Sequence, residues 1–84
     1  MSEERIYIIP LKEAYYVPRP KRANKAVKLI REFVKRHAKV ERVKLAEEVN
    51  EYIWKRNREK PPRRIKVKVV VHREEGEAEV FLAS

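Results

Sequence analysis

Residues 64–82 read RIKVKVVVHREEGEAEVFL, and this stretch decides the fold of the 84-residue chain. Every second residue from 65 to 71 is apolar, which predicts a β-strand over 64–72 with one buried face. The acidic run 74–77 contains the single glycine, Gly76, and indicates a tight turn in which the glycine takes a positive φ. Residues 78–82 then alternate again and predict a strand that pairs back.

Two amphipathic helices are expected before this hairpin. Over residues 21–37 the apolar side chains recur every three or four positions, and residues 46–57 repeat the pattern with Val49 and Ile53 inward. Glu47 and Glu48 open the second helix, where acidic side chains favour the helix dipole. Pro61 and Pro62 enforce a break after it.

Two further strands complete the predicted topology. The β-prone run 5–11 predicts the first strand, in which Pro10 is tolerable only near an edge or a bulge, and residues 40–45 predict the second. Two prolines in residues 15–20 exclude a helix before position 21, so we expect a proline-containing extended arm at about 14–20. The prediction is a small single α+β domain over 1–84, of order β-α-β-α-β-β, with two helices packed on a mainly antiparallel sheet.

Composition narrows the class of protein. The chain carries 22 Lys and Arg against 13 acids, all of them Glu, for a net charge of +9, while 43% of its residues are still apolar. Cys, Asp, Thr and Gln are absent, which matches the trend of proteins that work at high temperature. No apolar run is long enough to span a membrane, and the acidic start at residues 1–4 is unlike a signal peptide. We therefore expect a soluble intracellular protein that does not contact membranes.

The charge is segregated along the chain. Residues 19–44 contain eleven basic groups and two acids, a local charge of +9, and residues 61–73 add five basic groups without an acid. On the first predicted helix, six side chains fall within roughly 80° of one another, and five of them are lysines. Like charges at this spacing repel, so a polyanion outside the chain is expected to neutralise them. The six are Lys21, Lys25, Lys28, Glu32, Lys35 and Lys39.

Residues for catalysis are scarce. His37 and His72 are the only histidines, and without Cys or Asp they have no metal partners at a recognisable ligand spacing. The serines lie at the two ends of the chain, where nothing holds a nucleophile in place, and one glycine cannot form a phosphate-binding loop. We predict that the chain is not an enzyme and holds no metal or cofactor.

Aromatic side chains allow two interpretations. We interpret Trp54 as a partly buried core residue, with stacking on a nucleobase beside its basic neighbours as the alternative. Tyr15 and Tyr16 in the predicted arm are balanced between the two roles. Tyr52 is expected at the rim of the core, and Phe33 and Phe81 wholly within it.

Basic residues carry the functional hypothesis. Those of the first helix, the arm and the third strand are expected to form one continuous positive surface that recognises the shape and phosphates of folded RNA. No predicted helix presents the Asn, Gln and Arg mixture that is typical of major-groove contact. The predicted RNA-binding residues are Arg19, Lys21, Arg22, Lys25, Lys28, Lys35, Trp54, Lys55, Arg56, Arg58, Arg63, Arg64, Lys66 and Lys68.

Several stretches together resemble a known family. The chain is similar, over nearly its whole length, to the large-subunit ribosomal protein family numbered thirty-one in the archaeal and eukaryotic scheme, and to its archaeal members in particular. The matching stretches are Arg5–Tyr7, Lys21–Ala26, Ile30–Phe33, Val49–Arg56 and Pro62–Val67. The spacing from Asn50 to Trp54, followed by proline and an alternating basic strand, is the most specific of these features.

This resemblance implies a structural protein of the cytoplasmic ribosome without enzymatic activity or cofactor. Its implied partners are large-subunit ribosomal RNA near the polypeptide exit tunnel, neighbouring ribosomal proteins and nascent-chain factors at the exit site, and we expect a monomer in isolation. Two alternatives stay open. One is a free nucleic-acid-binding module of the chromatin or regulatory kind, and the other is a small protein-interaction domain that uses its sheet edge.

Overall fold

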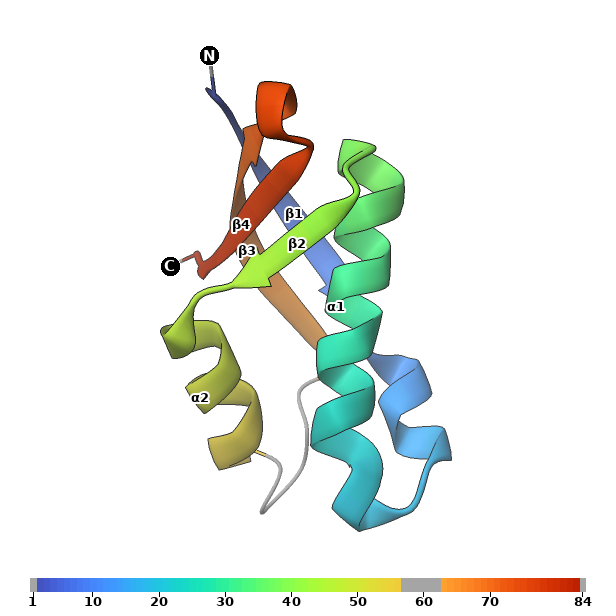
Figure 1. Cartoon of the computed structure of the whole chain (residues 1–84). Helices are drawn as coiled ribbons and strands as arrows, with labels where there is room; N and C mark the ends of the chain where they lie inside the picture. The colour runs from blue at the N-terminus through green and yellow to red at the C-terminus, as the bar shows by residue number, and fades with distance from the viewer. Residues whose placement is uncertain (1, 57–62, 84) are drawn as a thin grey trace.

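The computed structural model describes residues 2–56 and 63–83, and the fold is a sheet covered by helices on one face (Figure 1). The predicted order β-α-β-α-β-β is confirmed. Short 3-10 helices occupy three of the connections: η1 (Lys12–Tyr16), η2 (Arg19–Lys21) and η3 (Arg73–Glu75). The principal elements are β1 (Ser2–Pro10), α1 (Arg22–Ala38), β2 (Arg42–Leu45), α2 (Glu47–Arg56), β3 (Arg64–His72) and β4 (Glu77–Leu82).

The four strands form one mixed sheet in the order β1-β3-β4-β2. β3 pairs antiparallel with both β1 and β4, whereas β2 pairs parallel with β4. The prediction of a mainly antiparallel sheet is therefore confirmed. β1 is an edge strand, which explains how Pro10 is accommodated at its end, since an edge position does not need a second partner for the backbone.

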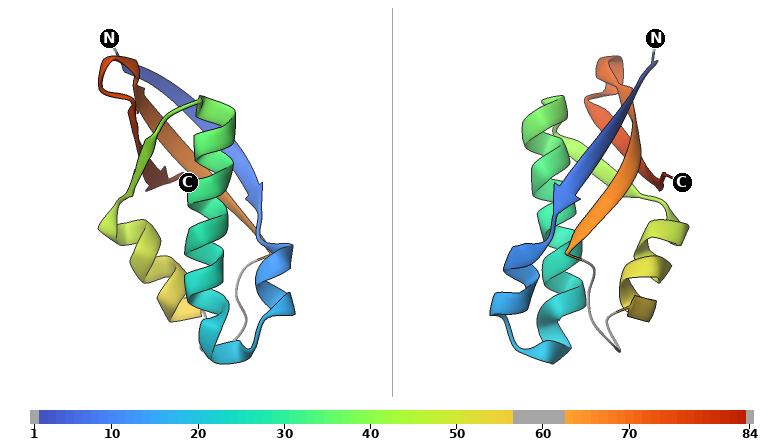
Figure 2. Two further views of the ribbon diagram at one scale, coloured as in Figure 1. Left: turned by 45° about the vertical axis from the view of Figure 1, so that its right-hand side comes forward. Right: turned by 180° about the vertical axis from the view of Figure 1, so that it is seen from behind.

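Both helices pack on the same face of the sheet, and the core lies between the two layers (Figure 2). The apolar stripe of α1 is fully buried, and the predicted inward pair of α2, Val49 and Ile53, is also fully buried. The alternating residues of β3 point into the same core, as predicted. Side chains with no more than 3% exposure include those of α1 (Ala23, Ala26, Ile30, Val34, Ala38), α2 (Val49, Ile53), β3 (Ile65, Val67, Val69, Val71) and β4 (Ala78, Val80), together with Ile9, Leu11 and Ala14.

The segment predicted as an extended arm is instead mostly 3-10 helix. The proline rule is respected for α-helix, because α1 begins only at Arg22. However, Pro20 lies at the start of η2, where the missing N–H costs nothing, and Pro18 precedes that turn in an extended conformation. Burial of Leu11 and Ala14 anchors η1 against α1. The expectation of an extended arm was therefore wrong, since tertiary packing folds the segment back.

Two residues adopt the left-handed conformation. Gly76 has φ +64° in the turn between η3 and β4, as predicted, and Lys39 has φ +56° at the end of α1. Phe81 differs from its prediction, because β4 alternates and buries Ala78 and Val80 instead. The phenylalanine lies opposite Lys68 on the other face of the sheet. Phe33 packs against the core but is only partly buried, so the prediction that it lies wholly within the core was wrong as well.

Candidate nucleic-acid interface

A stripe of lysines runs along the side of α1 that faces away from the sheet. Lys21, Lys28 and Lys35 are exposed and Lys25 is half-buried, as expected for side chains opposite the buried apolar stripe. No acid among the described residues forms an ion pair with any of the four. These four lysines lie on the helix face that the sequence predicted, and their neutralisation by a polyanion stays a prediction. We call Lys21, Lys25, Lys28 and Lys35 the α1 lysine stripe.

The beginning of α1 is unusually positive. Its first turn contains no acid, no side chain caps its free N–H groups, and Lys21 occupies the N-cap position. A helix N-terminus already carries a partial positive charge, so basic residues there are unfavourable for the isolated helix. The last turn is the reverse case, because Lys35, Arg36 and His37 complement the negative end of the dipole. An anion bound at the N-terminal end would remove this imbalance.

A basic hollow of about 410 Å³ lies between α1 and β2. Arg31 and Lys35 line it from α1, and Arg42 and Lys44 line it from β2, with Glu41 and Glu77 among its other lining residues. Arg31 Nη1 donates to the Val43 carbonyl at 3.1 Å and Arg42 Nη2 to the Glu75 carbonyl at 2.6 Å, so two of these cations are held in place. Of these four, only Lys35 was among the predicted RNA-binding residues. The signal for the others was the charge of residues 19–44, but spacing alone could not bring β2 to α1.

Arg22 has a structural role. Its Nε donates to the Val17 carbonyl at 3.2 Å and its Nη2 to the Tyr15 carbonyl at 3.4 Å. Its guanidinium carbon also lies 5.3 Å from the centre of the Tyr15 ring. These contacts fasten the η1–η2 segment to the start of α1, and they occupy donors that a free phosphate-binding arginine would keep available. Arg19 on η2 remains exposed.

The end of α2 lies at the same end of the molecule as the start of α1, whereas β3 begins level with the middle of α1 (Figures 1 and 2). Trp54 is 44% exposed and absent from the core cluster, so its interpretation as a core residue was wrong. Tyr52 packs at the rim of the core, as predicted. Lys55, Arg63 and Arg64 are exposed, the side chain of Arg56 is not described, and Arg58 and the Pro61–Pro62 break lie outside the described residues.

Lys66 and Lys68 do not join the α1 lysine stripe. Both project from β3 on the face of the sheet opposite the helices, because their alternating neighbours Val67 and Val69 fill the core. The α1 lysine stripe faces away from the sheet. The helix layer and the sheet, which Figure 2 shows as two layers, therefore lie between the stripe and these two lysines. The predicted continuous positive surface is therefore divided between opposite sides of the protein.

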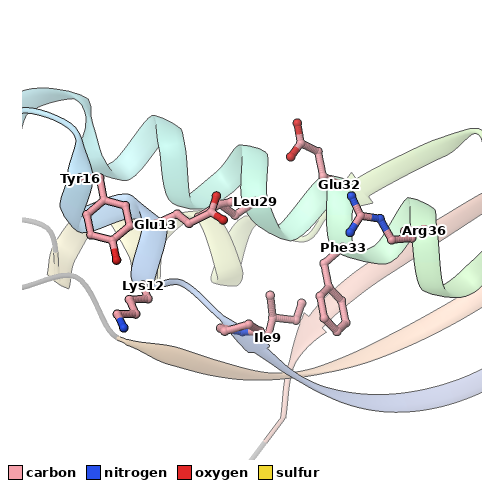
Figure 3. A pocket seen from close by; sticks show the side chains of 9 residues that line it. Ile9, Lys12, Glu13, Tyr16, Leu29, Glu32, Phe33 and Arg36 are labelled. Atoms are coloured by element: carbon pink, nitrogen blue, oxygen red, sulfur yellow. The ribbon is translucent and has the colours of Figure 1, made fainter.

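A second hollow, of about 420 Å³, opens between η1 and α1 (Figure 3). Its charged lining is balanced, with Lys12 and Arg36 against Glu13 and Glu32, and Tyr16 at its edge is 72% exposed. The carboxylates oppose the approach of a phosphate, so this hollow lies outside the candidate interface. The lining residues are Ile9, Pro10, Lys12, Glu13, Tyr16, Leu29, Glu32, Phe33 and Arg36.

A cluster around Glu3 joins β1 to the end of α1. Arg73 Nε donates to Glu3 Oε1 at 2.7 Å and Arg5 Nη2 to Glu3 Oε2 at 3.0 Å, and these hydrogen bonds lower the pKa of the Glu3 carboxyl. Arg5 Nη1 donates to the Tyr7 hydroxyl, which together with Glu3 raises the pKa of the guanidinium. The same arginines donate to the carbonyls of His37 and Ala38. Both arginines therefore fasten the fold together.

The described part of the chain holds no group of three or more His, Cys, Asp or Glu arranged for a metal ion. Among the side chains that the structure describes, in residues 3–55 and 63–83, no polar or charged one is buried. None of the helices in these ranges combines the length and hydrophobicity needed to cross a bilayer.

Fold and surface together define a small basic α+β protein whose described polar groups all lie at the surface. The chain belongs to the Ribosomal protein L31e family, and the sequence model of that family matches residues 3–79. It is 53% identical to a Large ribosomal subunit protein eL31 of Methanothermobacter thermautotrophicus over 94% of this chain and 96% of that one. The protein of the same name from Staphylothermus marinus is 48% identical, with 98% and 86% of the two chains covered.

A third relative of that name, from Methanopyrus kandleri, is 46% identical over 96% of this chain and 93% of its own length. The resemblance noted from the sequence is thereby confirmed, including its archaeal character. The chain is accordingly a protein of the large ribosomal subunit, acts in the cytoplasmic ribosome, and is not an enzyme.

Proposed function

We propose that the chain binds ribosomal RNA through the helix side of the molecule. The binding surface comprises the α1 lysine stripe and the basic hollow between α1 and β2, and it continues to Arg19, Lys55 and Arg63 at one end. Arg64 lies outside this surface, because it alternates onto the same face of β3 as Lys66 and Lys68. The observation that carries the proposal is the α1 lysine stripe, four cations in a row without an acidic partner among the described residues. Phosphates would neutralise their mutual repulsion and the uncapped helix end together.

The surface is suited to the shape of folded RNA. Its cations are Lys and Arg on a convex helix and a neighbouring strand edge, which contact phosphates without reading base edges. Trp54, exposed beside Lys55, adds an aromatic face on which an unpaired base or a ribose can stack. Arg22 belongs to the fold in this proposal, and Lys66 and Lys68 lie outside the RNA-binding surface.

A salt titration tests the proposal. Binding of the full chain to folded large-subunit ribosomal RNA should weaken as salt rises, because each neutralised phosphate releases counterions. Lys25→Gln, Lys28→Gln and Lys35→Gln should each reduce the slope of log affinity against log salt by about one. The matched control is Lys12→Gln, an exposed lysine in the charge-balanced hollow, which should leave that slope unchanged.

Two outcomes would overturn the proposal that the helix side binds ribosomal RNA. Affinity that does not change with salt would exclude phosphate neutralisation as the basis of binding. Equal affinity for random duplex DNA and for ribosomal RNA would favour the alternative of a general nucleic-acid-binding module.

We further propose that the bound protein lies near the polypeptide exit tunnel, as the family resemblance implies, beside other ribosomal proteins and nascent-chain factors. In isolation the same basic surface should keep the chain monomeric through self-repulsion. Stalled ribosomes that carry a photoreactive group along the nascent chain test the location, since an adduct with this protein is expected only after the chain emerges. Sedimentation of the free protein tests the monomer.

A further inference from the structure

The face of the sheet opposite the helices is open. Seen from behind, no helix of the described residues covers β1 and β3 (Figure 2, right). Ile6 and Ile8 project from β1 on this face and are 56% and 59% exposed, while the intervening Tyr7 turns toward the core. These are the two most exposed aliphatic side chains in the described part of the chain. Nothing in the RNA-binding surface proposed above uses them.

The strand register places cations directly beside these isoleucines. Ile6 lies opposite Lys68 and Ile8 opposite Lys66, and on the far side of β3 Phe81 lies opposite Lys68. A hollow of about 280 Å³ lies among them, lined by Ile6, Lys66, Lys68, Leu82 and Ala83. We call Ile6, Ile8, Lys66, Lys68 and Phe81 the open-face patch.

The charge of this patch is positive and poorly compensated. Glu4 Oε1 lies 3.7 Å from Lys68 Nζ at an exposed position, and this is the one acidic contact that the described residues supply to the patch. Glu79 lies on the same face of β4, two residues from Phe81, and its carboxylate contacts His72. Glu77 lies at the start of β4, and Glu3 of β1 is held by Arg5 and Arg73. Lys66 therefore projects beside apolar surface without a carboxylate among the described residues.

From this arrangement we infer that the open-face patch binds a segment of a second protein that carries apolar side chains together with carboxylates. Exposed aliphatic side chains rimmed by charge are typical of protein interfaces, because only an apolar partner gains by covering them. The two lysines select a partner of opposite charge. An edge strand with exposed isoleucines is also prone to self-association unless it is covered.

RNA is the less suitable occupant of this face. Phosphates would be attracted by Lys66 and Lys68 but would leave Ile6 and Ile8 in water or bury them against charge. The inference rests on the proposed function only in assigning RNA to the opposite side of the molecule. The protein would then join RNA on its helix side to a protein neighbour on its sheet side.

Zero-length carbodiimide cross-linking of purified large subunits tests this inference, because the reagent joins an ammonium only to a carboxylate in direct contact. Lys66 or Lys68 should become linked to Asp or Glu of another protein, within a peptide that also contains aliphatic or aromatic residues. Lys28 on the α1 lysine stripe is the matched control and should form no such link if RNA covers it. Mass spectrometry identifies the joined peptides.

A variant tests the apolar half of the patch. Ile6→Thr combined with Ile8→Thr keeps β-branched side chains at exposed positions, so the strand should persist. The cross-link yield from Lys66 should fall about tenfold, since two buried isoleucines contribute at least that much affinity. Circular dichroism of the free variant confirms that it is folded.

The outcomes are separable. Absence of intermolecular links from both Lys66 and Lys68, or an unchanged yield in the folded double variant, overturns this inference. Protection of the two lysines by RNA instead of protein also overturns it. A link from Lys28 to a protein carboxylate counts against the proposed RNA side and leaves the open-face result standing.

Discussion

At the scale of single residues, Arg22 shows that local charge does not reveal which contacts an arginine makes. Its position in the most basic part of the chain placed it among the predicted RNA-binding residues. In the structure its donors reach the carbonyls of Tyr15 and Val17, and its guanidinium packs on the Tyr15 ring. Local charge density therefore identified a basic region of the chain but not the contacts that hold this residue within the fold.

Replacing Arg22 by lysine separates charge from geometry. Arg22→Lys should lower the free energy of unfolding by about 1 kcal/mol, because a lysine keeps the charge but cannot make both hydrogen bonds. The salt slope of RNA binding should stay at its wild-type value. Urea denaturation and the RNA titration measure the two effects. A stable protein with a reduced slope would assign Arg22 to the RNA instead.

Glu3 provides a prediction about pH. Its pKa lies below the ordinary 4.5, mainly through the hydrogen bond from Arg73 and then that from Arg5. A carboxyl with a lowered pKa in the folded state binds fewer protons than in the unfolded state, so its stabilising contribution is present above pH 4.5. That contribution is lost as the pH falls from 4.5 through the lower folded-state pKa.

The variant Glu3→Gln should therefore be less stable than wild type at neutral pH and should approach it in acid. Because Glu3 is exposed, we expect a small difference. Urea denaturation from pH 7 to pH 2 measures it. Parallel pH profiles of the two proteins would show that the cluster with Arg5 and Arg73 contributes nothing.

At the scale of elements, the end of α1 and the turn between η3 and β4 each contain a residue in the left-handed conformation. Gly76→Ala should destabilise the protein by about 1 kcal/mol, because alanine is strained at φ +64°. Steric contact does not add to this cost, since the added Cβ meets no atom within 4 Å.

Lys39→Gly should stabilise the protein by about 1 kcal/mol, since φ +56° at the end of α1 suits glycine. Thermal unfolding of both variants checks the opposite signs.

The two faces of the sheet should respond differently to the same truncation. Ile30→Ala removes a fully buried side chain of α1 and should cost about 2–5 kcal/mol. Ile6→Ala, on the open face, should cost less than about 1 kcal/mol in the free protein. Urea denaturation compares them. A large loss from Ile6→Ala would mean that the sheet depends on this face for its own stability, without any partner.

At the scale of the whole molecule, composition predicts thermal behaviour. The chain lacks Asp, Thr, Gln and Cys and is rich in Lys, Arg and Glu. Charged residues of this kind are favoured at high temperature because their dehydration becomes less costly. We expect the free protein to unfold above about 65 °C, beyond the usual range of mesophilic domains. Differential scanning calorimetry at neutral pH measures the midpoint, and a value within the mesophilic range would refute the expectation.

The two-sided organisation of the molecule explains its mixed surface. The helix layer presents lysines that repel one another, whereas the sheet presents isoleucines flanked by lysines. A free protein gains nothing from either surface. Both become favourable within an assembly, where RNA supplies phosphates on one side and a protein neighbour supplies apolar and acidic side chains on the other.

What the sequence alone determined was the local structure. The period of the apolar residues predicted α1, α2 and the β3–β4 hairpin, because that period reflects which side chains share a face of one element. The same reasoning identified the α1 lysine stripe and the positive φ of Gly76. For the segment after β1 it was insufficient, since local proline rules exclude an α-helix but do not exclude the 3-10 turns that burial of Leu11 and Ala14 stabilises.

Tertiary structure alone decided how these elements meet. The parallel pairing of β2 with β4 depends on residues more than thirty positions apart, and it brings Arg42 and Lys44 to α1, where they form the basic hollow. Alternation along β3 assigned Lys66 and Lys68 to one face but could not say that both helices would cover the other. The single positive surface inferred from the sequence is therefore two separate surfaces in the structure. A sequence pattern shows which residues share a face of one element, whereas packing decides what lies against that face.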